Sequence, residues 1–593
     1  MSKYTATIAD MSFVLFDVLE ADRILGRLPS FESFGRDVYD AVLEEAGKFT
    51  GQILAPLNTI GDREGCGFEA GQVTTPAGFK EAYQQFVEGG WNGLVAEPDH
   101  GGQGMPEVIG AAVKEMLDSA NLSWGNYPLL SHGATEALKH VAADWQRDVF
   151  LKPIVEGRWT GTMCLTEPHC GTDLGLLKTR AEPGPEGDWR LHGTKIFITG
   201  GEHDMAENIV HLVLARLPDA PPGTKGISLF IVPKFKVGRD GHMGERNAVS
   251  CGSIEHKMGI KASATCVMNF DGAEAYLIGE PNKGLNAMFI MMNTARLAVG
   301  LQGLGLIERA YQNALAYARD RLQMRALTGP KRPDKPADPI IVHPDIRRML
   351  LTQKAIAEGG RALAYYAYLQ EDLKQRATDE AARQRADDLV SFLTPIVKGV
   401  LTELANECTY HAVQILGGHG YIAEWGQEQF ARDARITTIY EGTTQIQALD
   451  LLGRKILQLQ GPGLKLFLAE IGAFCGTHAG NPALAEFIAP LARLAKEWGE
   501  LTLEIGAKAQ KNPDEMGAAA VDYLYYAGYV AMAYFWAREI AALDHRHGAD
   551  FSESKRGTAR FYYARVLPRT AMHAASIRAG SDSLMAMPES AFG

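Results

Sequence analysis

Helical periodicity dominates the first part of the chain. Between about residues 33 and 159, apolar residues recur three and four positions apart, as in FGRDVYDAVLEEAGKFTGQIL (34–54). That spacing places the apolar side chains on one face of a helix. We therefore predict an N-terminal helical domain over residues 1–160.

The pattern changes to short apolar runs over residues 161–280. These runs include GTMCLT, WRLHGTKIFITG, ENIVHLVLARL, ISLFIVPKF and ATCVMNFDGAEAYLI, separated by breaks such as PGPEGD and PDAPPGTKG. Short apolar runs bounded by glycine and proline are typical of β-strands. This segment is predicted to form a small β barrel or a sandwich.

Helical periodicity returns after residue 281 and continues almost to the end. The proline-rich stretch GPKRPDKPADP (329–339) is predicted to be a loop between two helices, and QLQGPG (458–463) to be a second break. We expect a helical bundle over 281–460 and an extra helical domain over 465–593. The fold class is mainly α with a central β domain.

Two apolar stretches, 284–307 and 518–537, are long enough to be mistaken for membrane spans. The first contains Asn286, Asn293 and Arg296, and the second contains Asp522 and several tyrosines. Because such groups are costly in lipid, we expect two buried helices and no membrane contact.

Composition narrows the possible functions. The chain has 59 basic and 71 acidic residues, a net charge of −12, which argues against an unspecific nucleic-acid binder. Its seven cysteines are scattered without CxxC spacing, so neither a disulfide framework nor a zinc site is expected. The N-terminus does not resemble a signal or transit peptide, and a cytoplasmic protein is expected.

The segment IYEGTTQIQ (439–447) carries the clearest candidate for catalysis. Glu441 lies between Tyr440 and Gly442, with apolar or small residues before it. Poor solvation raises the pKa of a carboxyl group, as a general base for a weakly acidic C–H bond requires. A glycine lets the backbone approach a ligand. The alternative is a buried structural glutamate at a junction between a loop and a helix.

Three further motifs carry groups that could contact a ligand. MCLTEPHCGTD (163–173) contains turn residues that place Thr166 and Thr172 on loops. In KIFITGG (195–201), Phe197 and Thr199 share one strand face, although a core phenylalanine beside a surface threonine is the commoner arrangement. QILGGHGY (414–421) is glycine-rich but follows no predicted strand, so it is not a Rossmann fingerprint.

These motifs, together with RDARI (432–436), resemble the acyl-CoA dehydrogenase family in their order and spacing over roughly residues 40–455. The two terminal regions resemble the larger bacterial subgroup that includes 3-methylmercaptopropionyl-CoA dehydrogenases. The resemblance implies a helical domain, a β barrel and a four-helix bundle, with the extra C-terminal helical domain. It also implies FAD bound between the β unit and the bundle.

The resemblance implies α,β-dehydrogenation of an acyl-CoA thioester to the trans-2-enoyl-CoA. Glu441 matches the catalytic base that takes the α-proton, while the β-hydrogen leaves as hydride to flavin N5. The Glu441 backbone N–H would hold the thioester carbonyl. Some relatives carry their base on a bundle helix just before an arginine, but here Ala295 precedes Arg296, so that alternative base is absent.

The resemblance also assigns binding roles by position. The flavin ring is expected beside Met163, Leu165, Thr166, Phe197 and Thr199, and the adenosine and pyrophosphate beside Gln414, Gly418, Thr443 and Gln445. Thr172 and Arg296 match positions that contact CoA, and Tyr440 and Gly442 flank the base on the substrate side. No metal ligand is expected.

Arg321 matches an arginine that reaches the FAD of a neighbouring subunit, which implies a homodimer, with a tetramer as the alternative. Two positions depart from the family pattern: Phe197 replaces a common tryptophan, and Met324-Arg325 replaces Phe-Gly after the arginine.

Three functions remain open on the sequence alone. The first is a dehydrogenase of fatty acid β-oxidation type that passes electrons to an electron-transfer flavoprotein. The second is an acyl-CoA oxidase that uses O2, and the third is a flavin-containing, DNA-associated binding protein. The acidic charge and the intact Glu441 count against the third, so no nucleic-acid partner is expected. Both fatty acyl-CoA and methylmercaptopropionyl-CoA fit as substrates.

Overall fold

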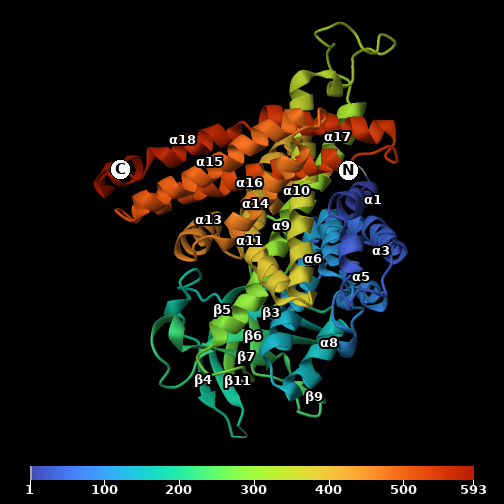
Figure 1. Cartoon of the computed structure of the whole chain (residues 1–593). Helices are drawn as coiled ribbons and strands as arrows, with labels where there is room; N and C mark the ends of the chain where they lie inside the picture. Colours follow the sequence, from blue (N-terminus) through green and yellow to red (C-terminus); the bar gives the residue numbers. More distant parts are fainter. Residues whose placement is uncertain (1–2, 186) are drawn as a thin grey trace. The chain divides into compact units, whose positions relative to one another are not determined.

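The computed structural model describes residues 3–185 and 187–593 (Figure 1). The chain groups into two compact units, which we describe separately. The first comprises Met1–Gly47, Pro106–Ser119 and Val299–Gly593, and the second comprises Lys48–Met105 and Ala120–Ala298. Two long helices, α6 (Glu107–Val141) and α9 (Gly284–Asp320), contribute residues to both. The finer division into four segments stays a prediction.

The second unit contains the predicted β domain. Its main strands are β3 (Trp159–Cys164), β4 (Arg180–Pro183), β5 (Trp189–Thr199), β6 (Asn208–Arg216), β7 (Ile227–Pro233), β10 (Val249–Ile254) and β11 (Thr265–Ile278). Pairing runs from β11 through β5, β4, β6 and β7 and returns to β11, so the sheet closes on itself. A closed sheet is a barrel, which decides between the two architectures that the sequence allowed.

Short helices and two hairpins complete this unit. The short helical elements are η2 (Thr50–Leu54), α4 (Ala55–Glu64), α5 (Phe79–Glu88), η3 (Trp91–Gly93), η4 (Pro98–His100), α7 (Asp144–Gln146), η5 (Arg147–Leu151), α8 (Lys152–Val155), η6 (Leu174–Leu176) and η7 (Gly223–Gly226). The hairpins are β1 (Gly67–Glu69) with β2 (Gln72–Thr74), and β8 (Phe235–Val237) with β9 (Met243–Arg246). The first hairpin lies where we predicted only helix. Ala70 and Gly71 both have positive φ there, which fits a tight two-residue turn.

The first unit is almost entirely helical. Its N-terminal elements are α1 (Ile8–Ser12), η1 (Phe13–Val18), α2 (Ala21–Leu25) and α3 (Arg36–Phe49). The bundle continues with α10 (Pro344–Arg376), α11 (Glu380–Leu416), η9 (Gly417–Tyr421), η10 (Ala423–Trp425), α12 (Gln427–Thr437), α13 (Thr444–Leu449) and η11 (Asp450–Gln458). The proline-rich stretch 329–339 lies in the loop between α9 and α10, as predicted.

The C-terminal helices pack directly on the bundle helices (Figure 1). They are α14 (Pro462–His478), α15 (Ala485–Ala509), α16 (Asp514–Ala542), α17 (Ala549–Phe561), η12 (Tyr562–Val566), α18 (Arg569–Ala579) and α19 (Asp582–Met585). Helix α16 contacts the bundle helices α10 and α11 and the C-terminal helices α15 and α18. Its approach to α11 is close because a Cβ at Gly528 would lie only 2.5 Å from Val400.

The two apolar stretches are buried helices, as expected. Within the described part of the chain, one helix, α9, is long and apolar enough to cross a membrane by composition, but 78% of its apolar window is buried inside the protein. Helix α16, which contains the second stretch, is buried along most of its length. Tertiary packing therefore accounts for both apolar stretches.

A buried ionic network joins the N-terminal segment to the C-terminal helices. The Lys555 ammonium contacts the carboxylates of Asp10, Glu358 (3.1 Å) and Glu539 (2.7 Å). Arg361 binds Asp10 as well, and its other contacts are Glu115 and Glu308. Asp10 therefore connects two cations on different helices.

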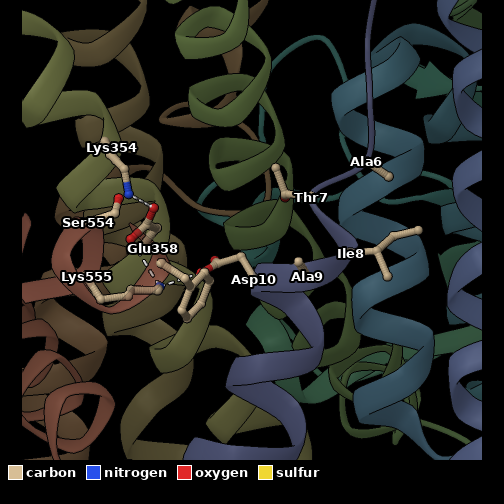
Figure 2. A pocket seen from close by; sticks show the side chains of 10 residues that line it. Ala6, Thr7, Ile8, Ala9, Asp10, Lys354, Glu358, Ser554 and Lys555 are labelled. Atoms are coloured by element: carbon tan, nitrogen blue, oxygen red, sulfur yellow. Dashed lines mark hydrogen bonds and ion pairs between the residues drawn. The ribbon is translucent and has the colours of Figure 1, made fainter. Parts of the chain in front are cut away.

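A cavity of about 270 Å³ lies beside this network (Figure 2). It is lined by Ala6, Thr7, Ile8, Ala9, Asp10, Lys354, Glu358, Phe551, Ser554 and Lys555. None of the residues that the sequence motifs predicted for the functional site lines it. Its four charged side chains are already paired with one another.

Candidate active site

Glu441 lies on a strained turn between two helices of the first unit. Helix α12 ends at Thr437 and α13 begins at Thr444, whose N-terminus is capped by the Thr443 hydroxyl accepting the Ile446 N–H at 3.3 Å. Glu441 has φ of +57° and Gly442 has φ of +92°. A left-handed backbone at a residue other than glycine costs about 1–3 kcal/mol and is concentrated at functional sites.

Two fully buried side chains hold the carbonyl groups of this turn. Lys398 on α11 donates from Nζ to the Gly442 carbonyl at 2.6 Å. Gln447 on α13 donates from Nε2 to the Glu441 carbonyl at 3.1 Å and to the Gly442 carbonyl at 3.4 Å. The motif search missed both residues. A usable signal for Lys398 was a single lysine in the apolar run FLTPIVKGVL (392–401).

The space at Gly442 is taken by the protein itself. A Cβ there would lie 2.7 Å from Gln447 Nε2 and 3.3 Å from Ile446 Cγ2. We predicted that this glycine lets the backbone approach a ligand. The structure adds a second reason for the glycine, because its positive φ and the neighbouring Gln447 side chain both disfavour a Cβ; the approach of a ligand stays a prediction.

Tyr440 is anchored to the bundle. Its hydroxyl donates to Gln302 Oε1 on α9. Burial, with the negative charges of Asp118, Glu441 and Asp433 around it, raises the pKa of Tyr440 well above its usual value. The phenol is therefore neutral near pH 7 and keeps this hydrogen bond. Glu441 itself is half-buried, as are Tyr440 and Gly442.

The glycine motif forms an open backbone at the end of α11. Gln414 and Gly418 are exposed. At Gly417 and Gly418, apart from the adjoining residues of the chain, no atom of the described residues lies within 4 Å of where a Cβ would stand. Gly420 differs, because a Cβ there would lie 2.3 Å from the Val413 carbonyl oxygen, so its role is packing. On α13, the Gln445 side chain is exposed as well.

Arg321 and Arg325 have different roles in the loop after α9. Arg321 is exposed, with Nη2 3.5 Å from Gln323 Oε1. Arg325 instead donates to the Arg332 carbonyl at 2.9 Å and to the Lys335 carbonyl at 2.5 Å. Arg325, one of the two residues that replace Phe-Gly, thus anchors the loop through these hydrogen bonds, while Arg321 stays accessible.

In the second unit, a buried ion pair fastens two motifs together. Lys195 on β5 donates to Glu167 Oε1 at 2.9 Å and to the Leu165 carbonyl at 3.0 Å. The Glu167 carboxylate also accepts the Thr179 hydroxyl and the Lys178 N–H. Burial opposes its ionisation, but Lys195 and these donors hold the pKa of Glu167 below its usual value.

Glu167, His169 and Cys170 have side-chain donor atoms within 4.8 Å of one another, which is close enough for a metal site. Both Glu167 oxygens already accept hydrogen bonds, and His169 Nε2 lies 2.9 Å from the Leu176 carbonyl oxygen. The cluster is a hydrogen-bonded junction of the loop, which agrees with a structural role for His169 and Cys170.

Phe197 is displayed on the surface by a β-bulge. The register between β5 and β11 shifts because Ile198 faces Cys266 while Lys195 faces Met268, which leaves one extra residue on β5. Phe197 has φ of +60° and is 59% exposed. The commoner arrangement, a core phenylalanine, is therefore wrong here. A strained, exposed aromatic ring is instead suited to contact a ligand.

The other predicted residues of this unit lie around the same two motifs. The Ile196 N–H donates to the Thr166 carbonyl at 2.9 Å, which joins the loop to the bulge. Met163, Thr166 and Thr199 are half-buried, and Leu165 is buried. Thr172 is exposed on its loop, whereas Arg296 on α9 is buried near Asn293.

Three family models match the chain. The middle domain of acyl-CoA dehydrogenases matches residues 162–273, and the acyl-CoA dehydrogenase C-terminal domain matches residues 282–457. An acetyl-CoA dehydrogenase C-terminal-like domain matches residues 467–588. Together these matches cover more than half of the sequence.

Known proteins agree with these matches along the whole chain. The chain is 44% identical to 3-methylmercaptopropionyl-CoA dehydrogenase of Ruegeria pomeroyi, over 98% of this chain and 99% of the relative. It is 36% identical to a butyryl-CoA dehydrogenase of Syntrophomonas wolfei, over 99% of both proteins. The fold matches an acyl-CoA dehydrogenase complexed with FAD from Bacillus anthracis, with a TM-score of 0.74 and 21% identity over 95% and 91% of the two chains.

These findings confirm the predicted fold, including the barrel and the C-terminal helical region. They also support a flavin as the cofactor. The chain belongs to the acyl-CoA dehydrogenase family, in the subgroup of its 3-methylmercaptopropionyl-CoA dehydrogenase relative, and is an oxidoreductase that acts on acyl-CoA thioesters.

Proposed function

We propose that the protein oxidises the Cα–Cβ bond of a short acyl-CoA to the trans-2-enoyl-CoA, with FAD as cofactor and Glu441 as the catalytic base. The observation that carries this proposal is the strained turn that presents Glu441, with both of its carbonyl groups held by buried side chains. Such a turn fixes a carboxylate in position before the substrate arrives.

Glu441 takes the α-proton of the thioester, and the bond electrons pass toward the thioester carbonyl. We assign the Glu441 backbone N–H to stabilise the charge that develops on that oxygen. When bound, FAD would supply the acceptor for the β-hydride. The substrate thereby loses one proton and one hydride, which together are two electrons and two hydrogens.

The residues of each unit fit parts of FAD. In the second unit, the exposed ring of Phe197 offers a stacking surface beside the loop of Met163, Leu165 and Thr166, and Thr199 follows on the same strand. In the first unit, we assign an anionic phosphate of FAD to the backbone at Gly418, which is open to a ligand. The other residues that we assign to the adenosine and pyrophosphate are Gln414, Thr443 and Gln445.

We propose 3-methylmercaptopropionyl-CoA or a short linear acyl-CoA as the substrate. The relatives at 44% and 36% identity are named for 3-methylmercaptopropionyl-CoA and butyryl-CoA, whose acyl chains are similarly short. Thr172 and Arg296 are assigned to the CoA portion, and Tyr440 and Gly442 to the acyl end beside the base.

We propose an electron-transfer flavoprotein as the electron acceptor and a cytoplasmic homodimer as the working form. The family resemblance supports the electron acceptor and the dimer, and the N-terminal sequence is the ground for the cytoplasmic location. The exposed Arg321 supports the dimer, since it is available to a cofactor in a second subunit. The dimer is also supported by large apolar side chains that are exposed on the first unit, because exposed apolar surface often marks an interface between proteins. These side chains are Met324, Leu327 and Tyr421.

Anaerobic titration of the purified flavoprotein with a panel of acyl-CoAs tests the proposal. We expect short acyl-CoAs to bleach the flavin in the wild type, and Glu441→Gln to slow this by at least ~10³-fold because no base remains. Glu424→Gln, at an exposed glutamate of η10, is the matched control and should bleach normally. If Glu441→Gln bleaches as fast as the wild type, Glu441 is not the base. If the reduced flavin is reoxidised rapidly once O2 is admitted, the protein is an oxidase.

A further inference from the structure

Lys398 is a buried cation whose position the proposed chemistry does not yet explain. It lies in the middle of α11, fully buried, within the apolar run 392–401. An ammonium group away from water is costly unless it is paired or hydrogen-bonded. One of its partners is a backbone carbonyl, that of Gly442, at 2.6 Å.

That carbonyl belongs to the residue directly after Glu441. The Lys398 ammonium and the Gln447 amide both donate to it, and Gln447 also holds the Glu441 carbonyl. A third contact fixes Thr444, two residues after Gly442, because Thr444 donates from Oγ1 to Glu403 on α11 at 2.5 Å. Helix α11 therefore contacts this segment through two residues, Lys398 and Glu403, which lie five positions apart on the helix.

The turn needs such support because its backbone is strained at Glu441, which has positive φ although it is not a glycine. Glu441 and Gly442 both have positive φ, and without external hydrogen bonds a glutamate relaxes toward negative φ. That relaxation would rotate the peptide groups on both sides of Glu441. It would move the carboxylate and the backbone N–H together.

We propose that Lys398 is a positioning residue for the catalytic turn: its charged hydrogen bond to the Gly442 carbonyl keeps Glu441 in the left-handed conformation that aims its carboxylate at the α-proton. This inference rests on the proposed function of Glu441. Hydrogen bonds from a charged donor are about twice as strong as neutral ones, which suits a lysine to a strained backbone.

The lysine also brings a positive charge next to the base. The acidic groups around the same turn are Glu403 on α11, Asp118 on α6 and Asp433 on α12. A positive charge near a carboxylate favours its ionised form, and a variant without Lys398 lacks that effect. Loss of the lysine should therefore change the pH dependence of the reaction as well as its rate.

The test compares Lys398→Met with Lys455→Met in the flavin-loaded protein. Lys455 is a matched control because it is also buried and also donates to a backbone carbonyl of α11, that of Ser391. We expect Lys398→Met to lower kcat by ~10–100-fold with KM within about threefold, and to shift the acid limb of the kcat profile to higher pH. Lys455→Met should leave both unchanged.

A second readout follows the turn itself. Hydrogen exchange of the peptide covering residues 437–449 should be faster in Lys398→Met than in either the wild type or Lys455→Met. If Lys398→Met does not fold, Lys398→Gln replaces it, since the amide keeps a donor but removes the charge. We then expect a smaller loss of kcat and the same shift of the acid limb.

Glu441→Gln, measured alongside, separates the two proposals. If Glu441→Gln retains wild-type activity, the proposed base is wrong. If Glu441→Gln is inactive while the Lys398 variant matches Lys455→Met in kcat, pH profile and exchange, the base stands and the positioning role of Lys398 is refuted.

Discussion

At the scale of single residues, three of the nine non-glycine residues with positive φ in the described part of the chain are positions that the motifs and the family resemblance single out. Phe197, Met324 and Glu441 all have positive φ, although none is a glycine. The first is the aromatic assigned to the flavin, the second follows the arginine assigned to a neighbouring subunit, and the third is the candidate base. Each costs about 1–3 kcal/mol, which a structure retains where the surroundings enforce it.

Phe197→Gly should separate stability from cofactor binding. Glycine adopts positive φ without strain, so we expect the flavin-free protein to melt at the same or a higher temperature. Loss of the exposed ring should weaken flavin retention about tenfold, which corresponds to ~1.4 kcal/mol. The measurements are the melting temperature of the flavin-free protein and the flavin dissociation constant. Unchanged flavin retention would contradict the stacking role of Phe197.

At the scale of elements, the ion pair between Glu167 and Lys195 joins the TEPHCGTD loop to the KIFITGG strand. Lys195 is fully buried, and its bonds to Glu167 and to the Leu165 carbonyl fix the loop relative to the bulge. The two motifs therefore act as one structural unit. This explains why Leu165, Thr166 and Phe197 come together even though about 30 residues separate the loop from the strand.

Lys195→Met should destabilise the protein by about 3–5 kcal/mol, because it leaves the buried Glu167 carboxylate without its cation. The double variant Lys195→Met with Glu167→Gln should recover part of that loss, since no uncompensated charge remains. Denaturant unfolding of all three variants and the wild type gives the coupling energy. Additive losses would show that the two side chains act independently.

At the scale of the whole molecule, the first unit contains a buried network with an excess of negative charge. Its carboxylates are Asp10, Glu115, Glu308, Glu358 and Glu539, and its cations are Lys354, Arg361 and Lys555. Burial raises the pKa of Glu539 to about 7, against the opposing effect of Lys555. The network therefore links protonation to the attachment of α16 and α17 to the N-terminal segment.

Glu539→Gln should flatten the pH dependence of stability. Because the folded-state pKa of Glu539 lies above its ordinary value of 4.5, its stabilising contribution is complete below about pH 4.5 and is lost as the pH rises through about 7. Glutamine mimics the protonated form at every pH. The difference in free energy of unfolding between the variant and the wild type should therefore be larger at pH 8.5 than at pH 5, by about 1–3 kcal/mol in favour of the variant.

The control for this comparison is Glu553→Gln, an exposed glutamate on α17. Melting curves at pH 5, 7 and 8.5 provide the measurement for all three proteins. A Glu539→Gln variant that loses stability with pH as steeply as the wild type would show that Glu539 does not titrate in this range.

The sequence by itself determined the class of most segments and the candidate site residues, although it missed the hairpin of β1 and β2. Apolar residues three and four positions apart give way to short apolar runs where the barrel begins. This change is informative because residues on one face of a helix recur about every 3.6 positions, whereas those on one face of a strand recur every two. Glu441, Phe197 and Gly418 were identified as candidates because their motifs are local. The buried nature of α9 and α16 followed from polar residues within their apolar stretches.

The tertiary structure alone decided which distant groups support those candidates. Lys398 lies more than 40 residues before the turn that it holds, and Lys195 lies 28 residues after Glu167. The bulge that exposes Phe197 arises from the register between β5 and β11, which alternation along one strand does not encode. Closure of the barrel, likewise, depends on β7 pairing with both β6 and β11. Local patterns fix elements and reactive residues, whereas hydrogen bonds between segments far apart in the chain exist only once the fold has brought them together.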